Sequence, residues 1–76
     1  MNWEQFDQEM MEIALREARQ GYNEAEVPVG AVLVFENQFI TANHNRNIQL
    51  NDPTAHAEIL VLQEASKILN QKRHNR

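Results

Sequence analysis

The chain has 76 residues, which is enough for one small domain. Hydrophobic residues make up 42% of it, a share that fits a globular chain and argues against a disordered one. It contains no cysteine, so it can form neither a disulfide nor a thiolate metal site of its own. The formal net charge is −4, and the first residues are acidic, which excludes a signal peptide. No apolar run nears the roughly 20 residues of a membrane span, so we expect a cytoplasmic protein without a membrane partner.

An amphipathic helix is predicted over residues 3–20. Gly21 is placed to end it, as the first residue beyond the last helical turn. We interpret the apolar stripe of this helix as core packing and not as a ligand site. Its members recur at helical spacing: Trp3, Phe6, Met10, Ile13, Ala14 and Ala18.

Two strands are predicted next, over residues 27–35 and 39–43. The first, "VPVGAVLVF", is apolar throughout, which is typical of a strand covered on both faces. Gly30 within it indicates either a bulge or the close approach of a ligand or another backbone. The residues "ENQ" between the strands predict a tight hairpin turn, in which Asn37 tolerates left-handed geometry.

A polar loop leads to a second predicted helix over residues 55–70. Thr54 or Asp52 is placed to cap this helix, with Pro53 at its threshold. The order helix, strand, strand, helix predicts part of a layered α/β fold, within one domain over residues 1–76. Because a two-stranded sheet is marginal alone and leaves open edges, the pattern favours a larger sheet.

The C-terminal end is basic, with no acid among its last ten residues. We interpret this charge as a match to the negative end of the helix dipole, with a nucleic-acid contact as the alternative. The basic residues are Lys67, Lys72, Arg73 and Arg76.

His56 and Glu58 stand two residues apart at the start of the second helix, in "NDPTAHAEILVL". Residues two apart do not share a helix face, but at a helix N-terminus both side chains can reach around the end. We expect the apolar neighbours to desolvate Glu58 and raise its pKa, which suits a proton carrier. A neutral imidazole is the commonest metal ligand. The pair alone is more often a surface histidine and a dipole-stabilising glutamate, yet it is also the pattern of a metal-bound water beside a proton shuttle.

Two further motifs accompany the pair. The segments "VPVGAVLV", "NRN" and "NDPTAHAEI" together resemble the zinc-dependent nucleobase deaminases of the cytidine and deoxycytidylate deaminase superfamily. The nearest likeness is to the bacterial tRNA-specific adenosine deaminases. The resemblance implies a partial cytidine-deaminase-like three-layer α/β fold and hydrolysis of adenosine to inosine at the tRNA wobble position. "DPTAHAE" is shared with guanine deaminases, so a guanine or cytosine deaminase is the alternative, while "VPVGAV" and "NRN" favour the tRNA enzymes.

Carried over position by position, the resemblance assigns His56 as a zinc ligand and Glu58 as the proton-shuttling glutamate. Asn45 matches the asparagine that hydrogen-bonds the substrate nucleoside. Val29 matches the apolar wall of the base pocket, which Gly30 lets the strand approach. The implied cofactor is zinc, and the implied partner is a tRNA anticodon stem-loop.

The sequence departs from the family in its metal ligands. The family takes two further zinc ligands from a Pro-Cys-x-x-Cys segment after a third strand, and this chain has no cysteine. Because a catalytic zinc site uses three protein ligands, we expect the site to be incomplete and the chain to be inactive alone. It is then a truncated N-terminal part of a deaminase, or one half of a split enzyme completed by a cysteine-bearing chain. A third hypothesis is a non-enzymatic module that pairs with an intact deaminase or with a second copy of itself.

Overall fold

The computed structural model describes residues 3–74, and side chains over residues 4–71. Four elements follow one another: α1 (Trp3–Asn23), β1 (Gly30–Phe35), β2 (Gln38–His44) and α2 (Ala57–His74). This order confirms the predicted helix-strand-strand-helix portion of an α/β fold. The basic C-terminal end falls largely outside the described side chains. Neither described helix is long and apolar enough to cross a membrane.

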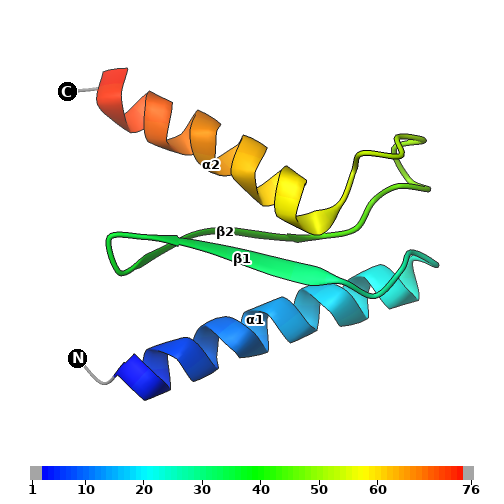
Figure 1. Ribbon diagram of the computed structural model, residues 1–76, viewed down its shortest axis with the longest axis horizontal. Helices are drawn as coiled ribbons and strands as arrows, with labels where there is room; N and C mark the ends of the chain where they lie inside the picture. Colours follow the sequence, from blue (N-terminus) through cyan, green and yellow to red (C-terminus); the bar gives the residue numbers. More distant parts are fainter. Residues whose placement is uncertain (1–2, 75–76) are drawn as a thin grey trace.

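The two helices lie on opposite faces of a two-stranded sheet, which gives three layers (Figure 1). Each helix contacts both strands. The Cα atoms occupy a thin slab of 37 × 32 × 14 Å, because the sheet is only two strands wide. α1 begins and α2 ends at one end of this slab, and the long loop between β2 and α2 lies at the other (Figure 1). Within the described residues, each strand therefore keeps one unpaired edge.

β1 and β2 form an antiparallel hairpin with a two-residue turn. Glu36 and Asn37 have positive φ angles of 50° and 63°, as in a type I′ turn. The left-handed geometry predicted for Asn37 is thereby confirmed. The register shifts between Leu33 and Val34, so the bulge lies away from Gly30 and does not explain that glycine.

Gly30 is the point where β1 comes closest to α1. A Cβ atom added there would collide with the carbonyl oxygen of Ala14 and would lie 2.8 Å from the amide nitrogen of Ala18. Close approach by another backbone, one of the predicted alternatives, is therefore the correct explanation. The neighbouring backbone is a helix, and the missing side chain sets how near this helix can pack to the sheet.

α1 continues three residues beyond its predicted end. Gly21 does not stop the helix, because it lies buried within it and has no positive φ. Ala25 adopts the left-handed conformation instead, with φ of 63°. The amide of Ala25 donates to the carbonyl of Tyr22 (3.1 Å), and the amide of Glu26 donates to that of Gly21 (2.9 Å). These paired bonds are a Schellman motif, formed here without a glycine at its left-handed position.

The remaining element ends also differ from prediction. β1 begins at Gly30 and not at residue 27, and β2 is one residue longer at each end. α2 starts two residues later than predicted because Asp52 and Thr54 bond each other and not the helix. Asp52 Oδ1 accepts hydrogen bonds from the hydroxyl (2.7 Å) and the amide (2.9 Å) of Thr54. Those two bonds lower the pKa of Asp52.

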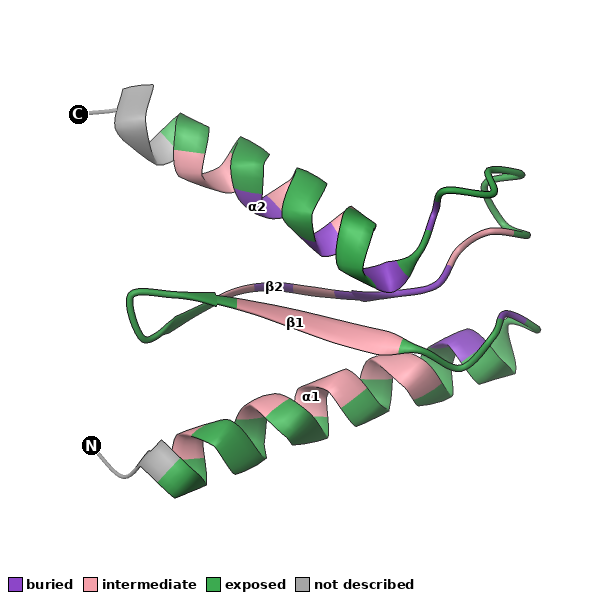
Figure 2. Cartoon of the chain, viewed as in Figure 1, coloured by how far each residue is buried: buried purple, intermediate pink, exposed green. Residues whose placement is uncertain are grey.

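The apolar core is small and lies beneath α2. Figure 2 shows buried positions on the inner face of α2 and toward the end of β2, while β1 is mostly half-buried. Val34 and Phe35 at the end of β1 are exposed, so the described chain covers this strand less completely than its sequence predicts. The buried apolar residues are Ala55, Ala57, Val61 and Ala65.

We predict that the chain alone is marginally stable and self-associates. Its strand edges are open and large apolar side chains such as Met11, Phe39 and Leu62 are exposed, and surfaces of this kind recruit partners or aggregate. Sedimentation at micromolar concentration should show oligomers or aggregates. A cooperative melt of a monomer well above about 50 °C would contradict the prediction.

Candidate functional site

The four predicted site residues lie on segments that meet where β2 ends and α2 begins. Asn45 directly follows β2, and its backbone amide donates to the carbonyl of Val29 (3.1 Å). Its side-chain Oδ1 accepts the backbone amide of Ala57 (2.8 Å). Because Ala57 stands between His56 and Glu58 in the chain, one asparagine links the segments of all four residues.

Asn45 caps α2 from a distance of 12 residues along the chain. The first amides of a helix have no partner within it, so a side-chain oxygen at this place stabilises the helix start. Since Ala57 offers an N–H, the atom facing it must be the oxygen of the Asn45 amide. The Nδ2 group makes no hydrogen bond within the described residues and is not sealed from solvent. Asn45 is thus able to hold the helix with its oxygen and offer its N–H groups to a ligand.

Val29 and the two residues flanking Ala57 have exposed side chains. Val29 is 41% exposed just before β1, and both His56 and Glu58 are exposed. The desolvation predicted for Glu58 from its apolar neighbours is wrong for the described chain. The reason is that the adjacent Ile59 is itself 36% exposed, so this face of α2 has no covering layer.

A zinc ion does not fit the described residues alone. A catalytic zinc site uses three protein ligands. Across the described part of the chain, no three residues of His, Asp or Glu are grouped so that they could hold a metal ion. His56 is therefore a candidate ligand without companion ligands among the described residues.

Glu26 is a site-building residue that sequence reasoning missed. It is only 5% exposed, and its two carboxylate oxygens accept the backbone amides of Ile48 (3.0 Å) and Gln49 (2.7 Å). These amides belong to the loop between Asn45 and α2, so Glu26 fixes the path of that loop. No local sequence pattern predicts this role, because the hydrogen-bond partners of Glu26 lie more than twenty residues away in the sequence.

The rest of the "NRN" segment also shapes this loop. Arg46 Nε donates to Asn43 Oδ1 (2.7 Å), and the Arg46 amide donates to the carbonyl of Ala55 (2.9 Å). Asn47 Nδ2 donates to the carbonyl of Asp52 (3.0 Å). The motif therefore holds the two ends of the loop together while its first asparagine caps the helix.

His44 is a second residue without a predicted role. It is 1% exposed and is the largest fully buried side chain of the described residues. Its Nδ1 lies 2.8 Å from Glu17 Oε1, and its Nε2 lies 2.8 Å from Glu24 Oε1. The pKa of Glu24 is lowered, first by a hydrogen bond from Gln20 and then by the bond from His44.

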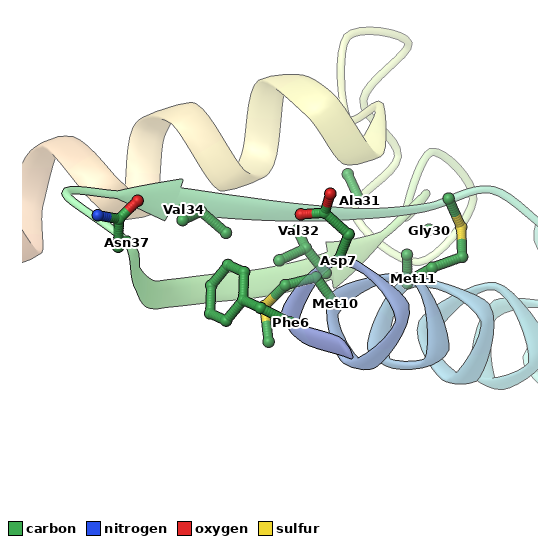
Figure 3. Close-up of a pocket in the computed structure, with 10 residues that line it drawn as sticks. Phe6, Asp7, Met10, Met11, Gly30, Ala31, Val32, Val34 and Asn37 are labelled. Atoms are coloured by element: carbon green, nitrogen blue, oxygen red, sulfur yellow. The ribbon is translucent and has the colours of Figure 1, made fainter. Parts of the chain in front are cut away.

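A hollow of about 710 Å³ lies elsewhere, between α1 and β1 (Figure 3). We call it the α1–β1 groove. None of the four predicted site residues lines it, and its lining is mostly apolar: Phe6, Asp7, Met10, Met11, Ala14, Gly30, Ala31, Val32, Val34 and Asn37.

The chain matches a known protein family. Residues 4–76 match the family model described as the cytidine and deoxycytidylate deaminase zinc-binding region. The chain belongs to this family. Its segment "NDPTAHAEI" and the helix start that Asn45 caps lie within the matched range.

Individual relatives agree with the family assignment. The tRNA-specific adenosine deaminase of Aquifex aeolicus is 48% identical over 82% of this chain and 41% of its own length. The tRNA(Ile)-lysidine synthase of Thermus thermophilus is 58% identical over 68% of this chain, but over only 10% of its own length. A solved structure, from studies of A-to-I editing by tRNA:A34 deaminases at the wobble position, superposes with a TM-score of 0.81 at 48% identity. The superposition covers 83% of this chain and 46% of that one, so the chain spans less than half of these relatives.

We predict that the chain alone does not hold zinc tightly. His56 is the one zinc ligand that the sequence predicts, and one imidazole gives a weak site. Competition with a chelator at neutral pH measures the affinity. Tight binding of one zinc per chain that is lost in His56→Ala would contradict the prediction and reveal other ligands.

We predict different outcomes for two Asn45 variants. Asn45→Ala leaves the buried amide of Ala57 without an acceptor, at a cost of about 1–2 kcal/mol. Asn45→Asp keeps the acceptor and adds a negative charge that the helix N-terminus favours. Hydrogen exchange followed by mass spectrometry should show faster exchange at Ala57 in Asn45→Ala alone. Equal protection in the unsubstituted chain and in Asn45→Ala would show that the cap is not needed.

Proposed function

We propose that this chain is the His-x-Glu-bearing part of a tRNA-specific adenosine deaminase, which converts adenosine to inosine at the wobble position. The observation that carries the proposal is the 2.8 Å bond from the Ala57 amide to Asn45 Oδ1. It ties the candidate substrate residue to the turn that bears His56 and Glu58. The named relatives support tRNA as the substrate class, since an adenosine deaminase and a lysidine synthase acting on tRNA share this segment. A role in tRNA processing agrees with the cytoplasmic location that we expect.

The chain's own residues divide the work of binding and proton transfer. The Nδ2 group of Asn45 donates to an acceptor on the base, such as the N7 atom of adenine. The exposed side chain of Val29 packs against the base. Glu58 takes a proton from the water whose oxygen adds to C6 of adenine and returns it to the amino group, which leaves as ammonia, so that inosine remains. Zinc is the proposed cofactor, with His56 as one ligand and the others supplied from outside the described residues.

The proposed source of the other ligands is a cysteine-bearing segment, in the same polypeptide or in a second chain. The unpaired edge of β1 offers main-chain groups for another strand. The α1–β1 groove beside this edge offers an apolar surface for the side chains of such a strand. A segment that pairs with β1 would cover exposed Val34 and bring new residues beside the sheet. The size of the relatives supports this occupant, because the chain spans 41% of the Aquifex protein.

Complementation tests the proposal directly. The chain is mixed with the cysteine-bearing half of a related tRNA adenosine deaminase, zinc and an anticodon stem-loop that carries adenosine. Inosine should form in the mixture and in neither half alone. Glu58→Ala should abolish inosine formation while zinc stays bound, because this residue moves protons and does not ligate. His56→Ala should lose both zinc and activity.

Asn45→Asp serves as the matched control for substrate recognition. It keeps the helix cap but replaces two donors with a second acceptor, so kcat/KM should fall by about tenfold or more. Inosine formation that survives Glu58→Ala would refute the assigned roles. Activity on guanine or cytosine compounds, with none on the stem-loop, would move the substrate to the alternative deaminase classes. A stable complex with an intact deaminase or a self-paired dimer, with no activity in any mixture, would favour the non-enzymatic module.

A further inference from the structure

His44 connects the end of α1 with the end of β2. It is the last residue of β2 and pairs with Gly30 in the hairpin. Its ring lies against Gly21, where an added Cβ would be 3.2 Å from His44 Cδ2. A side chain at position 21 would therefore crowd the imidazole, so that the contact with His44, and not the helix end, favours glycine here.

Both ring nitrogens of His44 face carboxylate oxygens at 2.8 Å. A neutral imidazole has a single N–H, whereas the imidazolium donates from both nitrogens. With Glu17 and Glu24 ionised, only the imidazolium satisfies both contacts. We call this arrangement the His44 bridge.

The charges around the ring are mostly negative. The last turn of α1 contains no basic residue, although a helix C-terminus carries partial negative charge that a cation relieves. Arg46, from the loop after β2, acts on Glu24 through its charge, and Gln20 bonds the same carboxylate. The paired residue in β1 is a glycine. His44 therefore lies within a largely negative surrounding.

His44 directly precedes Asn45, the residue that caps α2. Asn45 follows His44 directly and holds both Val29 and Ala57 through hydrogen bonds of 3.1 and 2.8 Å. A displacement of the buried ring would move the backbone from which these bonds are made. By holding the His44 ring, Glu17 and Glu24 thus fix the position of Asn45.

We propose that His44, as an imidazolium held between Glu17 and Glu24, is the positioning residue that sets Asn45 for the substrate, so that the site depends on a proton that takes no part in the reaction. This inference rests on the proposed function for its role in recognition, but the bridge itself is testable without substrate. Loss of the ring proton at higher pH removes one donor and loosens Asn45. Loss of charge on Glu24 at low pH removes an acceptor, so the bridge is complete between these two limits.

Hydrogen exchange on the full chain tests the bridge. Amide protection at Asn45 and Ala57 is measured at about pH 6 and about pH 9 and corrected for intrinsic exchange. Protection should fall about tenfold at the higher pH, the effect of losing one charge-assisted hydrogen bond. His44→Gln should show low protection at both values and no step between them.

Glu24→Gln is the most informative variant. It removes the need for a doubly protonated His44 ring but keeps the hydrogen bond between residue 24 and that ring. An amide at this position donates to a neutral imidazole, which then gives its own N–H to Glu17. Protection should therefore persist at the higher pH. Glu64→Gln is the matched control. Glu64 accepts hydrogen bonds from Thr41 (2.7 Å) and from Asn43 (2.9 Å) on the same strand without touching His44, so this variant should keep the pH step.

Two results would overturn the inference. One is equal protection of the unsubstituted chain at both pH values, and the other is loss of protection in Glu24→Gln at both, which would indicate a purely structural contact. In the complemented enzyme, KM for the stem-loop should rise at the higher pH and stay constant in Glu24→Gln. Absence of deaminase activity in every mixture would refute the proposed function, while the exchange data would still decide whether the bridge exists.

Discussion

The hydrogen bond between the Ala57 amide and Asn45 Oδ1 is the contact on which the candidate site depends. It determines where α2 begins, and so it determines where His56 leaves the loop and Glu58 enters the first turn. The same asparagine is held by Val29 through its backbone. A single residue, through its backbone and its side chain, therefore joins a strand entrance, a strand exit and a helix start. Asn45 is buried and its side-chain oxygen is held by the Ala57 amide, which gives the side chain the rigidity that a binding group needs.

The polar contacts of this chain hold together elements that a larger apolar core would otherwise join. The buried apolar residues are mostly alanines, which contribute little area to burial. Hydrogen bonds of 2.7–3.0 Å instead make these connections: Glu64 of α2 bonds β2, His44 of β2 bonds α1 and the segment after it, and Glu26 bonds the loop between β2 and α2. A hydrogen bond that involves a charged group contributes about 1.5–3 kcal/mol. Stability in this slab is therefore sensitive to the loss of single polar groups near the site.

Local signals in the sequence were enough for the element order and for the hairpin turn. The apolar run of β1 and the residues "ENQ" report on neighbours in the chain, and the structure agrees with both. The end of α1 was mispredicted because Gly21 lies inside the helix against the His44 ring, whereas Ala25 adopts the left-handed conformation. The roles of Glu26 and His44 could not be predicted, since each acts on residues 20 or more positions away. The family motif predicts the roles of His56 and Glu58, while the three-dimensional structure shows that both side chains are exposed.

The direction of α2 constrains how any further polypeptide could reach the site. This helix starts beside Asn45 and runs to the opposite end of the slab, where α1 begins (Figure 1). A segment that follows α2 would start away from His56 and would have to travel back along the sheet. Beside β1 it would run antiparallel to that strand, and six residues of extended chain would carry it about 20 Å. Residues that join His56 would therefore come from the far end of such a strand or from the turn after it.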